Sequence, residues 1–365
     1  MSLFTSPKFK RNVSRIVPFG LIWLLTGWMF TLSEALLPKN QGVNSAVDIN
    51  LTLPVFLFAA FSLTSLGLLV GTLETLVLQK RFLGYSFLRK TIFKFCIYMA
   101  IMFLAISITY PTAVAIESNS NVSSSEIWRQ TGDFLLSSLF FNALLQLSFS
   151  LLLSLLYSAI SENLGHNVLL NFYTGKYHKP IVEKRIFMFL DMKGSTAIAE
   201  QLGHVNYFKL LGDYYDLMSD PIINHSGEVY QYIGDEVVVS WKSPEGYQNN
   251  NCIRCFFEIK ENLEKKRDHF LSRYGVVPDF KAGIHFGEAT AGEIGALKKE
   301  IVFVGDVLNT TARIQGMCGE YQSDLIISDH LKSVLDEPSP FTITPLGDIK
   351  LKGKKGSMGL FSVER

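Results

Sequence analysis

Residues 186–196 read IFMFLDMKGST, and this stretch decides the fold of the second half of the chain. The apolar run Ile186–Leu190 leads directly to Asp191, and Lys193-Gly194-Ser195-Thr196 then opens a helix-like AIAEQL segment. An apolar run of this length between turn signals is typical of a buried strand. We therefore expect a strand, a loop and a helix here, with an acidic side chain at the end of the strand.

Short strand-like and helix-like segments continue from this unit to the C-terminus. Two of the strand-like runs meet at Gly234-Asp235, which is a hairpin signal. Segregated strands with several hairpins predict an α+β domain in which helices cover one sheet. The expected strands are 228–233, 236–241, 280–286, 301–304, 347–352 and 360–363, and the expected helices are 249–274 and 307–317.

The first part of the chain has a different composition. The 365 residues are 48% hydrophobic and only 18% charged, whereas a soluble domain has about 25% charged residues. Four stretches carry no charge at all, and about 20 apolar residues suffice to cross a bilayer as a helix. We therefore predict a four-helix transmembrane domain in residues 1–160, with spans at Ile16–Ser33, Ile49–Leu73, Phe95–Ile116 and Phe134–Ser161.

The basic residues of this part predict its orientation. Residues 1–160 contain 11 Lys or Arg, and nine of these lie either before the first span or between the second and third spans. Cytoplasmic loops carry the excess of basic residues in membrane proteins. The protein is therefore expected to be a multi-pass protein of the cell membrane with its N- and C-termini in the cytoplasm.

Ionisable residues are absent from the middle of every predicted span. Glu34, Glu74 and Lys94 lie at span ends, where we expect them to face the membrane interface. This pattern favours an anchor or sensor over a transporter. The tryptophans in or beside the spans are expected to act as interfacial anchors: Trp23, Trp28 and Trp128.

Residues 161–185 link the two parts. Apolar residues recur at helical spacing from Leu164 to Phe172, and Gly175 and Lys179-Pro180 then interrupt the helix. This segment is either a plain tether or a dimerising helix that couples the membrane domain to the soluble domain, 186–365.

Two acidic residues at strand ends suggest a metal site. Pairing of the strands around Asp191 and Asp235 would bring both carboxylates to one edge of the sheet. Hard oxygen ligands suit Mg²⁺ or Mn²⁺, which also bind substrate phosphates. The small residues Gly194, Ser195 and Thr196 open a helix, where free backbone N–H groups can bind an anion. The combination predicts a metal site next to a phosphate-binding loop formed by Lys193, Gly194, Ser195 and Thr196.

A further pair of polar residues lies on the helix predicted at 307–317. Asn309 and Arg313 are four residues apart and therefore share one helix face. An Asn side chain can hold a sugar oxygen, and an Arg side chain can stabilise charge on a phosphoryl oxygen.

Four fragments in order carry a family resemblance. FLDMKGST at 189–196, YIGDEVVVSW at 232–241, VGDVLNTTAR at 304–313 and KLKGKKG at 350–356 together resemble the class III nucleotide cyclases. They cover about 180 residues at that family's usual spacing. The resemblance implies a ferredoxin-like α+β cyclase domain that works as a head-to-tail homodimer, with its sites at the interface.

The resemblance also implies a reaction and the residues that carry it. The reaction is conversion of ATP to 3′,5′-cyclic AMP and pyrophosphate with two ions, Mg²⁺ or Mn²⁺, in each site. No general base of the protein is identifiable. The implied roles are metal binding by Asp191 and Asp235, ribose orientation by Asn309, transition-state stabilisation by Arg313 of the other subunit, and triphosphate binding by Lys352.

The base-binding positions depart from the family pattern. Adenylate cyclases usually have Lys at the position of Gln231 and Asp or Thr at the position of Val302. A Gln amide can donate to adenine or accept from guanine, whereas Val can do neither. ATP is the expected substrate, and GTP or a pyrimidine nucleotide is the alternative.

Other classes of protein fit the sequence less well. A diguanylate cyclase would need G-G-[DE]-E-F at the hairpin, where this chain has Ile233-Gly234-Asp235-Glu236-Val237. A non-catalytic nucleotide-binding membrane receptor should have lost one of the four key polar residues, and all are present. The net charge of +1 excludes a generally basic nucleic-acid binder. The expected partners are a nucleoside triphosphate, a second copy of the chain and the membrane.

Overall fold

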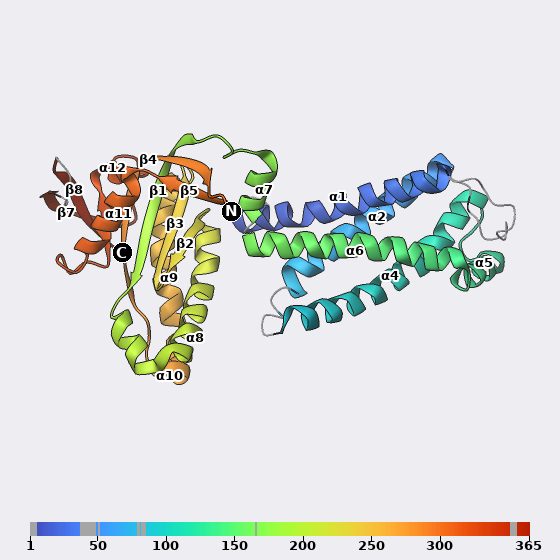
Figure 1. Cartoon of the computed structure of the whole chain (residues 1–365), viewed down its shortest axis with the longest axis horizontal. Coiled ribbons are helices and arrows are strands. Elements are labelled where there is room, and N and C mark those ends of the chain that lie inside the picture. Colours follow the sequence, from blue (N-terminus) through green and yellow to red (C-terminus); the bar gives the residue numbers. More distant parts are fainter. Residues whose placement is uncertain are drawn as a thin grey trace. The chain divides into compact units, whose positions relative to one another are not determined.

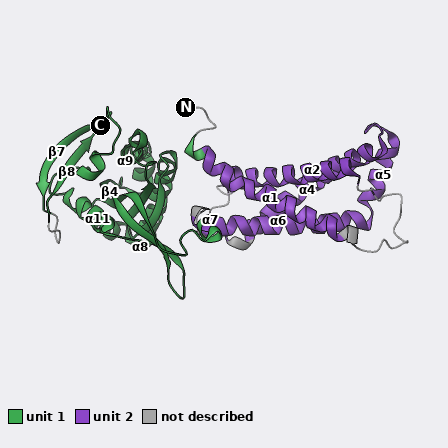
Figure 2. Cartoon of the chain, turned by 90° about the horizontal axis from the view of Figure 1, so that it is seen from above, with its two compact units in different colours: residues 1–8, 171–365 green, residues 9–170 purple. Residues whose placement is uncertain are grey.

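The computed structural model describes residues 6–36, 49, 52–78, 81, 85–164, 166–350 and 356–365. These residues form two compact units (Figure 2). One unit is Phe9–Leu170, and the other is Asn171–Arg365 with the residues up to Lys8. The division between residues 170 and 171 falls inside the predicted linker, 161–185.

Long helices make up the first unit (Figure 1). Among the residues that the structure describes, four segments are long and apolar enough to cross a membrane, namely Pro7–Ser33, Leu53–Leu78, Arg89–Ser118 and Ser138–Asn163. This confirms the expected four apolar helices. The elements are α1 (Pro7–Leu36), α2 (Leu53–Leu73), the π-helical turn η2 (Glu74–Leu78), α4 (Phe87–Ser118), α5 (Ser125–Leu135), α6 (Ser138–Leu164) and α7 (His166–Thr174).

The fourth span begins later than the sequence predicted. Residues up to Leu135 belong to the separate helix α5, and α6 starts at Ser138. Between them, the backbone N–H of Ser137 donates to the carbonyl of Phe134 at 2.9 Å. The Ser137 hydroxyl accepts from the N–H of Phe140 at 3.4 Å, which places a capping side chain at the start of α6.

Glycines bring α1 and α2 close together. A side-chain carbon at Gly67 would lie 2.7 Å from Cγ of Trp23, and one at Gly71 would lie 2.8 Å from Cγ of Phe19. Small residues spaced four apart are a common basis for close helix packing in membranes. Trp23 is fully buried, and its Nε1 donates to Oγ of Ser154 on α6 at 3.0 Å. The prediction that Trp23 is an interfacial anchor is therefore wrong.

Glu74 and Lys94 are also inside the bundle rather than at an interface. Their exposed fractions are 2% and 4%, and the two side chains form an ion pair between η2 and α4. Tyr98 is fully buried and donates its hydroxyl to Oε2 of Glu74 at 2.8 Å. The prediction from the sequence was wrong because it considered Glu74 and Lys94 one at a time. A buried charge becomes tolerable when an opposite charge pairs with it. The side chain of Glu34 lies outside the described residues.

The second unit is built on one largely antiparallel sheet (Figure 1). The strand order is β2-β3-β1-β4-β6-β8-β7, and β5 pairs with β4. The strands are β1 (Ile181–Met192), β2 (Glu228–Ile233), β3 (Glu236–Lys242), β4 (Phe280–Ile294), β5 (Glu300–Val304), β6 (Leu325–Ser328), β7 (Thr342–Ile349) and β8 (Met358–Glu364). The helices are α8 (Ser195–Asn224), the 3₁₀ turn η3 (Gln248–Asn250), α9 (Asn251–Lys265), α10 (Arg267–Tyr274), α11 (Asp306–Met317) and α12 (Asp329–Lys332).

Strand β1 starts five residues before the strand expected at Ile186. Its first half alternates exposed and half-buried positions, and Ile181 pairs with Ala291 near the far end of β4. A strand with only one covered face has no continuous apolar run, so the sequence pattern does not indicate this part of β1.

Helices cover both faces of the sheet, and β1 shows how. Ile186, Met188 and Leu190 pack in the core formed with α8 and α9. Phe187 and Phe189 pack on the opposite face, with Val307 of α11. Because successive side chains of a strand point to opposite faces, Asp191 continues the set that faces α11.

Candidate active site

Asp191 lies next to the last position of β1, on the face covered by α11. Its Oδ2 accepts a hydrogen bond from Nε2 of Gln315 at 2.9 Å. Lys281, the cross-strand partner of Asp191 on β4, places its Nζ 3.6 Å from the same oxygen. The carboxylate is half-buried and is held from one side by these two neighbours.

Asp235 lies in the turn between β2 and β3. Gly234 adopts a φ of +65°, which glycine reaches without strain, so the turn can be tight. Tyr215 of α8 donates its hydroxyl to the carbonyl of Gly234, and its ring lies 4.5 Å from that of Tyr232. The turn is therefore fastened to α8. Oδ2 of Asp235 is buried and has no hydrogen-bond partner among the described residues.

The sheet brings the two carboxylates to the same edge, as the sequence predicted. Leu190 pairs with Val237, so the end of β1 lies beside the β2–β3 turn. Glu236 reports the resulting charge: burial raises the pKa of its carboxyl, and the negative charges of Asp191 and Asp235 raise it further. The electrostatic potential at this edge is therefore strongly negative.

Such an edge fits a divalent cation. A buried carboxylate oxygen without a donor is costly, and a bound cation would satisfy Oδ2 of Asp235. Across the described part of the chain, no three His, Cys, Asp or Glu side chains are grouped so that they could hold a metal ion alone. The two aspartates would thus leave ligand positions for water and substrate phosphates, as is usual for Mg²⁺.

The predicted phosphate-binding loop caps α8. Gly194 adopts a φ of +65° and precedes the first helical residue, Ser195. The first N–H groups of a helix have no acceptor within the helix, so Ser195 and Thr196 present backbone donors.

Lys193 makes other contacts. Its backbone N–H donates to the carbonyl of Asp279 at 2.8 Å, and its Nζ donates to Oδ2 of Asp279 at 2.8 Å. The same ammonium pairs with Asp324. The donors of Lys193 are thus engaged by other residues of the protein.

Asn309 and Arg313 lie on α11, four residues apart. Asn309 is exposed and Arg313 is half-buried. Neither side chain forms a hydrogen bond or ion pair with any other described residue, and neither is bonded to Asp191 or Asp235. One chain alone therefore does not join these two residues to the carboxylate edge.

The two predicted base-binding residues lie on β2 and β5, which are not adjacent in the strand order. Gln231 is exposed on β2, beside an irregularity in its pairing with β3, and Val302 is half-buried on β5, opposite Gly292. The two strands meet where the N–H of Phe303 donates to the hydroxyl of Tyr230 at 3.2 Å. Lys352 lies outside the described residues.

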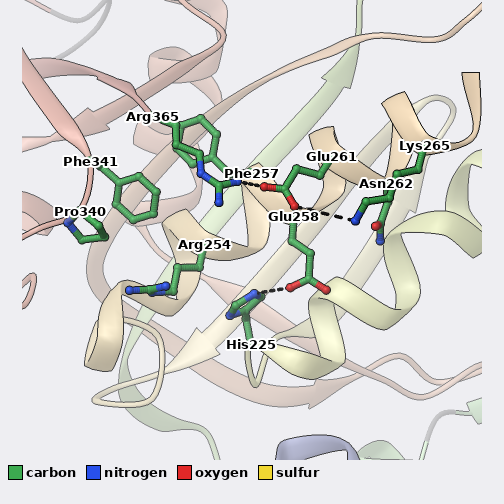
Figure 3. A pocket seen from close by; sticks show the side chains of 10 residues that line it. All are labelled: His225, Arg254, Phe257, Glu258, Glu261, Asn262, Lys265, Pro340, Phe341 and Arg365. Carbon is green, nitrogen blue, oxygen red and sulfur yellow. Dashed lines mark hydrogen bonds and ion pairs between the residues drawn. The ribbon is translucent and has the colours of Figure 1, made fainter.

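A surface cavity of about 300 Å³ lies elsewhere in the unit, at α9 and the C-terminus (Figure 3). Two pairs of its polar side chains are in contact: His225 with Glu258 at 2.7 Å, and Arg365 with Glu261. The stacked rings of Phe257 and Phe341 form part of its wall. Among the predicted site residues that the structure describes, none lines this cavity.

Sequence reasoning missed the neighbours of the two aspartates. Gln315, Lys281, Glu236 and Tyr207 all lie close to these carboxylates; burial and then the charge of Asp235 raise the pKa of Tyr207. The proximity of Glu236 could have been predicted, because it directly follows Asp235 in the sequence. The others depend on strand register and on helix packing between segments far apart in the sequence.

Comparison with known proteins identifies a family for the second unit. Residues 179–364 match the family model described as the adenylate and guanylate cyclase catalytic domain. Adenylate cyclase 2 of Rhizobium meliloti (strain 1021) is 35% identical over 204 residues, which cover 56% of this chain and 56% of that protein. Adenylate cyclase 1 of the same organism is 28% identical over 181 residues, 48% of this chain and 27% of that protein.

The fold has a counterpart among solved structures. A bacterial light-regulated adenylyl cyclase superposes with a TM-score of 0.52 at 20% identity, covering 62% of this chain and 65% of that one. The chain spans about half or less of the length of the two curated relatives. The match over residues 179–364, together with the two carboxylates, the helix start after β1 and the polar pair on α11, shows that this chain belongs to the adenylate and guanylate cyclase family.

Proposed function

We propose that the protein is a membrane-bound nucleotide cyclase that converts ATP to 3′,5′-cyclic AMP and pyrophosphate. One observation carries the proposal: Asp191 and Asp235 meet at one sheet edge, where a buried carboxylate oxygen lacks a donor. The helix start at Ser195 follows closely after β1, which ends one residue beyond Asp191. This arrangement suits a nucleoside triphosphate bound with divalent cations.

In the proposed reaction, the ribose 3′-oxygen attacks the α-phosphorus. The new 3′-O–P bond forms as the bond to pyrophosphate breaks, and the 3′-hydroxyl proton is released. Asp191 and Asp235 would hold two ions, Mg²⁺ or Mn²⁺, which would supply activation of the hydroxyl and neutralisation of the departing pyrophosphate.

The other residues of the site would bind and orient the substrate. The backbone N–H groups of Gly194, Ser195 and Thr196 would bind phosphate oxygens. We leave Lys193 out of these contacts because its donors are held by Asp279 and Asp324. Lys352 would bind the triphosphate, as the family resemblance implies.

Asn309 and Arg313 would act across a homodimer. Neither contacts the carboxylate edge of its own chain, so a second copy is the proposed recipient. Exposed apolar side chains on α8 and at the end of β2 are suited to an interface: Val205, Phe208, Tyr232 and Ile233 are 69%, 78%, 48% and 49% exposed. In the dimer, Asn309 would orient the ribose and Arg313 would stabilise charge on the reacting phosphate.

Membrane orientation is part of the proposal. The basic residues before the first span and between the second and third spans favour a cytoplasmic location for both termini. The cyclase unit would then use cytoplasmic nucleotide.

GTP is the second candidate substrate. ATP is favoured because the curated relatives at 35% and 28% identity are adenylate cyclases. However, Gln231 stands where adenylate cyclases usually have Lys, and its amide can also accept hydrogen bonds from guanine.

The test is direct. The purified full chain in nanodiscs is incubated with Mn²⁺ and an equimolar mixture of ATP, GTP, CTP and UTP, and cyclic products are identified by mass. We expect cyclic AMP as the main product. Cyclic GMP as the only product would mean that the substrate is GTP rather than ATP. The absence of every cyclic nucleotide would overturn the proposed activity.

A further inference from the structure

We propose that Gln315 is a positioning residue that orients Asp191 for metal binding, an inference that rests on the proposed cyclase function. Gln315 is 8% exposed, and its Nε2 donates to Oδ2 of Asp191 at 2.9 Å. It lies 124 positions from Asp191 in the sequence. None of the four sequence motifs includes it; the motif VGDVLNTTAR ends two residues earlier, at Arg313.

The fold places Gln315 with little freedom. Helix α11 lies directly against β4 at Gly283, where a side-chain carbon would come within 2.8 Å of Cα of Gln315. Only glycine allows this close approach. Gly283 is two residues along β4 from Lys281, the cross-strand partner of Asp191. The short distance between helix and sheet is what allows the Gln315 amide to reach the carboxylate.

The contact is selective for one carboxylate oxygen. Gln315 donates to Oδ2, and Nζ of Lys281 is 3.6 Å from the same atom. Oδ1 has no hydrogen bond from any residue in the described ranges. A neutral amide can therefore fix the rotation of Asp191 and leave Oδ1 as a ligand, without adding a second positive charge beside the cation. Such outer partners of metal ligands commonly set metal affinity.

Gln315 also connects the two proposed sites of the dimer. It follows Arg313 by two residues and Asn309 by six on the same helix. If α11 serves the partner's site, Gln315 ties that helix to the Asp191 of its own site. A shift of α11 would therefore alter metal binding in one site and substrate contacts in the other.

The first test measures Mn²⁺ binding by electron paramagnetic resonance, with full-length protein and a non-cyclisable ATP analogue. Gln315→Met removes the donor at similar volume, and exposed Gln248 supplies the control Gln248→Met. We expect about tenfold weaker Mn²⁺ binding in Gln315→Met and unchanged binding in the control. Binding within twofold of wild type in a folded Gln315→Met protein would overturn the proposal.

A second variant separates positioning from simple packing. Gln315→Glu adds a carboxylate beside Asp191, so Mn²⁺ should stabilise it against heat more than it stabilises wild type, because the ion relieves repulsion. In Gln315→Met, Mn²⁺ should stabilise less than in wild type. Equal Mn²⁺ responses in both variants would indicate a packing role only and would refute positioning.

The closing experiment uses heterodimers of two differently tagged chains, one with Asn309→Ala and one with Asp191→Asn. Their single intact site takes Asp191 from the Asn309→Ala chain. Gln315→Met should lower activity about tenfold when added to that chain, and by less than twofold when added to the Asp191→Asn chain. The reverse pattern would mean that Gln315 acts through Asn309 and Arg313, not through Asp191. An inactive parent heterodimer would instead count against the proposed function.

Discussion

At the scale of single residues, the carboxylate of Asp235 combines a stability cost with a proposed role. Its buried Oδ2 has no partner among the described residues, and an unsatisfied buried polar group costs about 1–3 kcal/mol, more when it is charged. A cation would remove that cost. The same atom therefore links the stability of the metal-free protein to its chemistry.

Asp235→Asn should separate these two effects. We expect cyclase activity to fall at least about 100-fold, beyond the loss typical of an outer partner of a metal ligand. The metal-free variant should be more stable than wild type by about 1 kcal/mol, because a neutral amide is cheaper to bury. Calorimetry in EDTA and activity with Mn²⁺ measure both quantities. A variant that is less stable without metal, or that keeps a tenth of the activity, would contradict this account.

Gln231 is the residue expected to set base preference. Gln231→Lys should move the ATP/GTP ratio of kcat/KM about tenfold toward ATP (~1.4 kcal/mol), because an ammonium only donates. Gln231→Glu should move it toward GTP, because a carboxylate accepts from guanine. Gln248→Lys and Gln248→Glu, at an exposed position outside the site, are the controls. If neither Gln231 variant changes the ratio, another residue reads the base.

The candidate residues that the sequence could identify are those defined by local signals. Asp191 follows an apolar strand, and Asp235 lies in a hairpin turn, so both could be placed at one sheet edge from pattern alone. Gln315 and Lys281 could not be assigned to Asp191, because their proximity depends on the β1–β4 register and on α11 packing against Gly283. Lys193 was placed correctly in the loop, but the sequence did not reveal the distant aspartates that bind it.

At the scale of elements, the membrane helices also have one feature that the sequence predicts and one that it does not. Their number follows from length and apolar composition, which the sequence gives directly. The burial of Glu74 and Lys94 does not, because it depends on η2 packing against α4. A π-helical turn often marks a functional position, and here it carries the acidic partner of the pair.

Glu74→Ala should destabilise the bundle, because Lys94 would remain buried without its carboxylate partner. Removing one member of a buried ion pair typically lowers the free energy of unfolding by about 3–5 kcal/mol, which is close to the whole free energy of unfolding of a small domain. The double variant Glu74→Ala/Lys94→Ala should be less destabilised than Glu74→Ala alone. Thermal unfolding in detergent, followed by circular dichroism, measures the three variants. Additive losses in the double variant would show that the two charges do not stabilise each other.

A second charged cluster links elements of the cyclase unit. Lys193 and Lys260 both bind Asp279, where β4 begins, and both bind Asp324, ahead of β6. Burial opposes ionisation of Asp279, but hydrogen bonds from Lys193 and Lys260 prevail and hold the pKa of its carboxyl below the ordinary value. The cluster thus fixes the loop that leads from Asp191 to α8.

This cluster predicts a pH dependence of stability. Because the folded pKa of Asp279 is lowered, its stabilising effect is complete above the unfolded pKa of about 4 and is lost as the pH falls through the folded value. Asp279→Asn should therefore show a smaller drop in melting temperature between pH 5 and pH 3 than wild type. Asp216→Asn, at an exposed position of α8, is the control. Identical acid profiles for Asp279→Asn and wild type would exclude this contribution.

At the scale of the whole molecule, the proposed site needs two chains. The carboxylate edge belongs to one chain, while Asn309 and Arg313 of that chain make no hydrogen bond or ion pair to it within the described residues. Monomers should therefore be inactive even with nucleotide and metal present. Phe208→Glu, at a 78% exposed position, should weaken dimerisation and lower activity in proportion.

The composite site is tested most directly by a heterodimer of a wild-type chain and a chain carrying both Asp191→Asn and Asn309→Ala, purified through two different tags. If each site takes its carboxylates from one chain and Asn309 from the other, both sites of this heterodimer carry a defect, and cyclic AMP should stay at background. The same substitutions divided between two chains should restore about half of the wild-type rate. If the wild-type chain paired with the double variant keeps half of the wild-type rate, each site lies within one chain, and the composite site is wrong.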